Sequence, residues 1–196
     1  MAATLMKPSA FLVLLLVAIA ANLVNCGPSH ADDNVRDACR ATRYRELCIH
    51  SLASFSGSAK RSPYRWARAS VSVTLSEAKK VQGYLSKQKK NGGAKGRAKA
   101  ALSDCAECFQ DAVDELHRSL GELRRLEKKT FEAQMGNVET WVSAALTYAD
   151  TCLDGFGGSE GRLASSVVRR VENFTYFTSN ALALVNKLAS GGGGRR

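Results

Sequence analysis

The sequence predicts an all-α protein, an up-down-up-down four-helix bundle preceded by an N-terminal helical hairpin tied by a disulfide. Three observations support this prediction. Apolar residues recur at three- and four-residue steps in four long segments, glycine-rich breaks interrupt the chain, and no strand-like alternation competes with the helical period. Four amphipathic helices with short connections pack most simply as an up-and-down bundle.

Each of the four apolar stripes would cover one face of a helix, and glycine-rich breaks at 57–63, 91–96 and 155–161 separate most of them. Pro63 suits the first turn of the first bundle helix. The stripes are, in chain order, Ala67, Val71, Leu75, Ala78, Val81 and Leu85; Leu102, Cys105, Phe109, Val113, Leu116, Leu120 and Leu123; Val138, Trp141, Ala145, Tyr148 and Cys152; and Leu163, Val167, Val171, Phe174, Ala181, Leu184 and Leu188.

Two short helical segments, 35–41 and 45–55, precede the bundle. Isolated helices shorter than about 12 residues are marginal in water, so these segments need support. Cys39 and Cys48 lie nine positions apart and would tie them into a hairpin. We therefore expect one domain over 32–190 in which 32–60 form the hairpin and 61–190 the bundle, followed by a disordered tail at 191–196.

The N-terminus predicts a secretory signal peptide over residues 1–31, with cleavage between residues 20 and 31. Residues 11–24 are an apolar stretch, which is short for a bilayer core of about 30 Å, and small residues that suit cleavage follow it. A membrane anchor is the alternative. The mature chain should be soluble and extracellular, with no membrane association after cleavage, and cleavage after Cys26 leaves five of the six cysteines.

No catalytic arrangement is apparent, so we expect no enzyme, no cofactor and no metal site. Cys105 and Cys108 form a C-x-x-C, but it lies inside a helical pattern rather than at a helix N-terminus that would stabilise a thiolate. A simpler interpretation is that Cys105 reaches Cys152 on the next helix and Cys108 is the odd thiol. The three histidines are isolated, and the chain has no phosphate-binding loop or nucleophile elbow.

The net charge of +10 includes a basic segment, Lys79–Lys99. Secretion argues against nucleic acid, so this segment is interpreted as a solvated surface or as a weak attachment to an extracellular polyanion. Asn173, Phe174 and Thr175 form a glycosylation sequon, which the secretory route makes usable.

Acidic residues group on the second bundle helix. Glu107, Asp111 and Asp114 step by four and three, so they share one outward face. If Cys105 bonds Cys152 on an antiparallel neighbour, Thr151 and Asp154 are brought close to them. This carboxylate strip serves either solubility or docking of a basic partner, in which complementary charge sets association rate and specificity.

Four segments together resemble the plant inhibitors of pectin methylesterase and invertase: 101–116, 140–156, 180–188 and 39–48. The resemblance covers essentially the whole mature chain. It implies disulfides Cys39–Cys48 and Cys105–Cys152, and a protein that binds a secreted carbohydrate-active enzyme one to one and obstructs its cleft. Positions that match the family's enzyme-contacting residues are Glu107, Asp111, Asp114, Thr151 and Asp154.

The resemblance leaves the target enzyme to be decided. Invertase inhibitors tend to carry Pro-Lys-Phe before the third bundle helix, where this chain has Lys129, Thr130 and Phe131 without proline. This favours pectin methylesterase as the partner, in the cell wall, with acid invertase as the alternative. A non-inhibitory wall protein that holds anionic pectin through Lys79–Lys99 is a second alternative.

Overall fold

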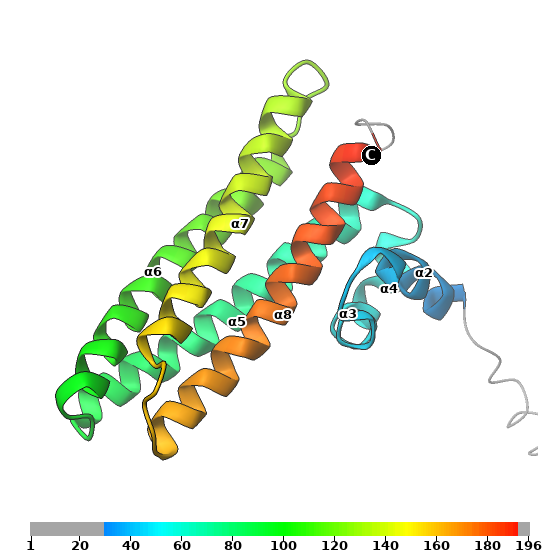
Figure 1. Ribbon diagram of the computed structural model, residues 1–196. Coiled ribbons are helices and arrows are strands. Elements are labelled where there is room, and N and C mark those ends of the chain that lie inside the picture. The colour runs from blue at the N-terminus through cyan, green and yellow to red at the C-terminus, as the bar shows by residue number, and fades with distance from the viewer. Residues whose placement is uncertain (1–29, 192–196) are drawn as a thin grey trace, which may run out of the picture.

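The computed structural model describes residues 30–191, which fold into helices joined by short loops, with no strand among them. The bundle consists of α5 (Pro63–Asn91), α6 (Gly96–Arg124), α7 (Phe131–Gly155) and α8 (Arg162–Ser190). Figure 1 shows α6 beside α7 and α5 beside α8, and each helix packs against its two neighbours in the ring. The predicted fold class is confirmed. Residues 1–29 of the predicted signal peptide and residues 192–196 of the predicted tail lie outside the described range.

The hairpin contains α2 (His30–Ala38), the 3₁₀ turn η1 (Cys39–Ala41), α3 (Arg45–Leu52), a second 3₁₀ turn η2 (Ala53–Phe55) and α4 (Ser56–Ala59). The first helix thus begins earlier than the sequence predicted, and helical structure continues through Gly57, where a break was expected. Only residues 60–62 link the hairpin to α5. The Ser62 hydroxyl caps α5 by accepting from the Arg65 backbone N–H at 3.4 Å, and Pro63 opens that helix as predicted.

The α6–α7 connection has no glycine and is held by the side chain of Gln134 instead. Its Oε1 accepts hydrogen bonds from the Glu127 backbone N–H at 2.7 Å and from the Thr130 hydroxyl at 3.0 Å. Its Nε2 donates to the Arg125 carbonyl at 2.9 Å. One amide therefore satisfies backbone groups on both sides of a turn that no glycine pattern indicated.

The predicted stripes of α5 and α6 are entirely buried. On α7, Val138, Ala145 and Cys152 are buried as predicted, but the prediction was wrong at two positions. Val142 and Ala149 are buried there, and Trp141 and Tyr148 are only half-buried. Successive residues of a helix lie about 100° apart around its axis, so when Val142 and Ala149 face the core, their neighbours Trp141 and Tyr148 turn towards its margin. The small side chain of Ala149 fits the close approach of α6 and α7, and the two large aromatic rings are left at the margin.

The hairpin docks on α5 and α8 through a second apolar cluster that includes Val35, Leu52, Trp66 and Leu184. Asn180 completes the attachment, because its Oδ1 accepts from the Tyr44 backbone N–H at 3.0 Å and its Nδ2 donates to the Tyr44 carbonyl at 2.9 Å. Only 5% of Asn180 is exposed. Its side-chain amide therefore replaces the hydrogen bonds that the Tyr44 N–H and carbonyl would otherwise make with water. This makes Asn180 the polar anchor of the hairpin.

Asn180→Ala should lower the free energy of unfolding by about 2–4 kcal/mol, because two hydrogen bonds are lost and the Tyr44 N–H and carbonyl are left unpaired. Urea denaturation measures the change. Asn137→Ala, which alters an exposed Asn on α7, is the matched control and should change stability little. Equal stability of the two variants would contradict the anchoring role of Asn180.

Candidate interaction surface on α6 and α7

The disulfide Cys105–Cys152 fixes how α6 and α7 lie against each other. Both cysteines are buried, their Cα atoms are 4.5 Å apart, and they are 47 residues apart in the chain. Closing a loop of this length removes unfolded-state entropy worth about 4 kcal/mol in the chain-entropy model. Because the helices run antiparallel, the bond also sets their register, so Glu107 and Thr151 lie at the same level as the disulfide.

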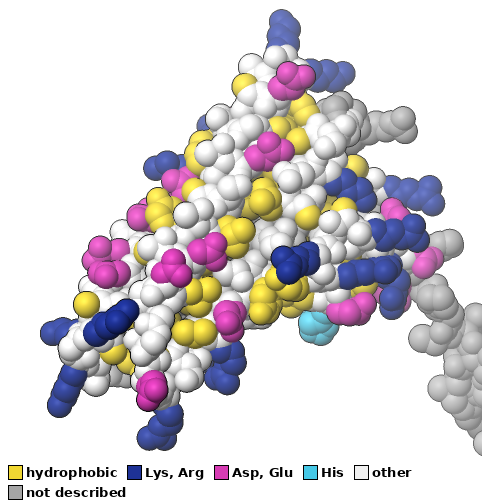
Figure 2. Space-filling model, viewed as in Figure 1, with side chains coloured by type: hydrophobic (Ala, Val, Ile, Leu, Met, Phe, Trp, Pro, Cys, Tyr) yellow, Lys and Arg dark blue, Asp and Glu magenta, His cyan; other side chains and the backbone are white. Residues whose placement is uncertain are grey.

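The structure exposes all five residues predicted to contact an enzyme: Glu107, Asp111 and Asp114 on α6, and Thr151 and Asp154 on α7. Among the described residues, none of these four carboxylates takes part in an ion pair. Figure 2 shows acidic side chains along the part of this view formed by α6 and α7, while Lys and Arg gather at the ends of the bundle and over the hairpin. The carboxylates are therefore free to meet cationic groups of a partner.

Threonines extend this surface along α7 in a way that the sequence analysis missed, apart from Thr151. Thr140, Thr147 and Thr151 are exposed and lie seven and four residues apart, which places them on one side of the helix. Their hydroxyls donate to the carbonyls four residues earlier, at 2.8, 3.2 and 3.0 Å. With its proton engaged, each hydroxyl offers only its remaining lone pairs, so these threonines act as acceptors, as the carboxylates of α6 do.

Two half-buried aromatic side chains lie on the side of α7 that faces α6. Trp141 and Tyr148 are seven residues apart, and Cys152, which bonds α6, follows Tyr148 by four. On α6, Glu115 pairs with Arg118 at 3.3 Å, and its Oε2 is buried without a hydrogen-bond partner in the described part of the chain. Aromatic groups within a polar margin are the usual composition of a protein interface.

Cys108 is the free thiol among the described cysteines, and it is half-buried on α6. Burial raises the pKa of this thiol above its ordinary value, and the charges of Asp111 and then Asp104 raise it further. Cys105 is engaged with Cys152, so the C-x-x-C does not supply a dithiol.

No group of three or more His, Cys, Asp or Glu in residues 30–191 is arranged to hold a metal ion.

The sequence profile described as "Plant invertase/pectin methylesterase inhibitor" matches residues 33–184. The chain belongs to this family. Within it, the chain is 43% identical over 160 residues to Pectinesterase inhibitor 6 of Arabidopsis thaliana, covering 81% of this chain and 76% of the relative. It is 38% identical over 193 residues to Pectinesterase inhibitor 3 of the same plant, covering 93% and 94%.

A solved structure has the same fold. The crystal structure of mutant form A of a pectin methylesterase inhibitor from Arabidopsis superposes with a TM-score of 0.62, covering 76% of this chain and 92% of the other, at 24% sequence identity. This agreement shows that the two proteins share a fold. No helix within residues 30–191 has the length and apolarity needed to cross a membrane.

The remaining predicted sites lie elsewhere on the molecule. The basic residues of Lys79–Lys99 are exposed along the second half of α5, on the loop that follows it and on the first turn of α6. Asn173 is exposed in the middle of α8, and the Thr175 hydroxyl of its sequon donates to the Glu172 carbonyl at 2.7 Å. Glycosylation of Asn173 stays a prediction.

Cys108 should react with iodoacetamide more slowly than glutathione at pH 8, because a raised pKa leaves less of the reactive thiolate at a given pH. The rate should rise as the pH increases beyond the ordinary thiol range. Asp111→Asn should lower the pKa and speed alkylation, and Asp114→Asn, whose charge does not perturb this thiol, is the control. Alkylation as fast as that of glutathione would contradict the assigned pKa direction.

Proposed function

We propose that the chain is a secreted, non-catalytic inhibitor that binds plant pectin methylesterase one to one and blocks its active-site cleft. In this role it limits pectin de-esterification in the cell wall. The observation that carries the proposal is the acceptor-rich face of α6 and α7, in a chain similar to proteins named Pectinesterase inhibitor 6 and Pectinesterase inhibitor 3. The enzyme-contacting residues are Glu107, Asp111, Asp114, Thr151 and Asp154.

The chemistry of this face defines the partner's complementary surface. Carboxylates and threonine oxygens accept hydrogen bonds, so the enzyme must supply donors: Lys, Arg, hydroxyl or amide groups near its cleft. Complementary charge chiefly raises the association rate and excludes wrong partners. The remaining chain is basic, so this attraction is local and should weaken as salt screens it over about 10 Å.

The shape of the α6–α7 surface supports a mechanism in which the inhibitor covers the enzyme's cleft rather than inserting a segment into it. The 25 residues of α7 span about 37 Å at 1.5 Å per residue, and α6 runs beside it. Two disulfide-linked helices of this length form a broad rigid surface that can cover a polysaccharide cleft. Since the surface is already ordered, little conformational entropy is lost on binding.

Secretion is part of the proposal. The apolar segment at 11–24 has the length of a signal-peptide core, and disulfides persist in oxidising compartments. Two disulfides are present within residues 30–191. Together these observations support an extracellular protein that meets wall enzymes.

Paired titrations test the function. The oxidised mature protein is added to a plant pectin methylesterase and, separately, to an acid invertase, which the family description also names. We expect methylesterase activity to fall to its minimum at one equivalent, with invertase unaffected. Loss of invertase activity alone would transfer the function to the alternative target, and loss of neither activity would refute inhibition of both enzymes.

The carboxylate strip on α6 should contribute measurably to binding of the enzyme. Glu107→Ala combined with Asp114→Ala should raise the inhibition constant about tenfold or more while changing the melting temperature little, because both side chains are exposed. Glu160→Ala with Glu172→Ala removes the same charge elsewhere and should leave inhibition nearly unchanged. An unaltered inhibition constant in the first double variant would refute the proposed docking face.

A further inference from the structure

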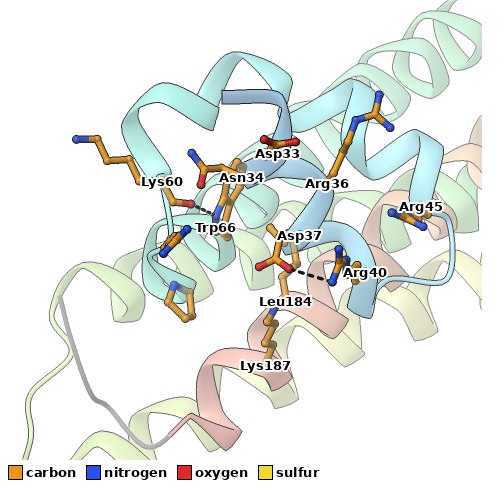
Figure 3. Close-up of a pocket in the computed structure, with 13 residues that line it drawn as sticks. Asp33, Asn34, Arg36, Asp37, Arg40, Arg45, Lys60, Trp66, Leu184 and Lys187 are labelled. Carbon is orange, nitrogen blue, oxygen red and sulfur yellow. Dashed lines mark hydrogen bonds and ion pairs between the residues drawn. The ribbon is translucent and has the colours of Figure 1, made fainter. Parts of the chain in front are cut away.

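A cavity of about 520 Å³ lies between the hairpin and the bundle, away from α6 and α7. We call it the hairpin pocket. Figure 3 shows α2 and the following turn on one side of it and Leu184 and Lys187 of α8 on the other. Its lining contains two carboxylates, Asp33 and Asp37, and a larger number of cations. The cations are Arg36, Arg40, Arg45, Lys60, Arg61 and Lys187.

Most of this positive charge is not neutralised within the protein. Asp37 pairs with Arg40 at 3.6 Å, and in the described part of the chain none of the other lining cations forms an ion pair. Like charges gathered around one cavity repel one another unless an anion separates them. The unpaired cations therefore favour an anionic ligand in the hairpin pocket.

The walls of the pocket are held in place without a ligand. The disulfide Cys39–Cys48 closes the hairpin, and Asn180 fastens its turn to α8. On the opposite side, Trp66 Nε1 donates to the Lys60 carbonyl at 2.8 Å, which ties residues 60–62 to α5. The backbone that carries the cations is thus fixed, and binding costs mainly the ordering of their side chains.

A partly exposed aromatic pair lies next to the lining residue Arg45 of the pocket. Tyr44 directly precedes the lining residue Arg45, and its ring centroid lies 4.3 Å from that of Tyr176. Tyr176 is 36% exposed, the most accessible large apolar side chain among the described residues, and the Arg43 guanidinium lies 5.6 Å from the Tyr44 ring. Rings next to cations offer an apolar face for a sugar beside groups that bind its carboxylate.

We propose that the hairpin pocket binds a carboxylated oligosaccharide, a short uronate oligomer. Arginine guanidinium groups suit carboxylates because they can donate two parallel hydrogen bonds, and the cavity volume lies within the range of about 300–1,000 Å³ usual for ligand sites. The choice of uronate rests on the proposed function, because hydrolysis of pectin methyl esters leaves uronate carboxylates. The pocket thus recognises the product of the enzyme that the protein inhibits.

The two surfaces do not compete for residues. The hairpin pocket is lined from α2, η1, α3, the 60–62 link, α5 and α8, whereas the docking face lies on α6 and α7. Figure 1 shows the hairpin lying against α8, with α6 on the far side of the bundle. The protein can therefore hold de-esterified pectin and the enzyme at once, which would concentrate the inhibitor where de-esterification has already occurred.

Calorimetric titration of the mature protein with a short oligogalacturonate of uniform length tests the proposal. No esterase is present, so failure of inhibition and failure of uronate binding remain separate results. The pocket variant is Arg36→Gln, Arg45→Gln and Lys187→Gln. The control variant, Arg124→Gln, Lys128→Gln and Arg162→Gln, removes the same charge from exposed positions outside both the hairpin pocket and the 79–99 segment. The fully methyl-esterified oligomer is the neutral ligand.

We expect the unmodified protein to bind the oligogalacturonate, and the methyl-esterified oligomer to bind at least tenfold more weakly. The pocket variant should lose about tenfold or more in affinity, since three charge contacts are removed, and the control variant much less. Unchanged melting temperatures verify that both variants fold. Equal losses in the two variants would mean that net charge alone attracts the oligomer, and absence of binding to the unmodified protein would likewise overturn the proposal.

Discussion

The covalent bond between Cys105 and Cys152 is the constraint on which the rest of this structure depends. It holds the Cα atoms 4.5 Å apart, and that spacing determines which side chains can lie between α6 and α7. Small residues such as Ala145 and Ala149 are buried, whereas Trp141 and Tyr148 are displaced to the edge of the contact. The same bond fixes how far α6 and α7 are shifted along each other, and so which exposed side chains of the two helices lie at the same level.

The sequence predicts the bundle well because the buried face of each helix is visible in the spacing of its own apolar residues. A stripe with a period of 3.6 residues shows which face of α5 or α6 is buried without knowledge of its neighbours, and Pro63 or Gly92 indicates where a helix begins or ends. The acidic positions on α6 are visible for the same reason. The stripe of α7 is less well predicted, because Val142 and Trp141 are both apolar, and only the distance to α6 decides between them.

Features that depend on contacts between residues far apart in the chain cannot be predicted from such local patterns. Asn180 is a polar residue beside an apolar stripe, and its value becomes apparent only when Tyr44 is brought to it. Gln134 holds a turn that contains no glycine, so the usual breaker signal is missing. The hairpin pocket joins the cations of residues 36–61 to Lys187, which lies more than one hundred residues later in the chain, and only the fold brings them around one cavity.

The attachment of Tyr44 to Asn180 has a consequence for the order of events during synthesis. The hairpin leaves the ribosome first, yet the residue that anchors it is made 136 positions later. Cys39 and Cys48 are only nine residues apart, so they can be joined before the rest of the chain has been made. The apolar face of the hairpin then has no packing partner until α8 is synthesised. The earliest part of this protein to be made is therefore among the last to reach its final position.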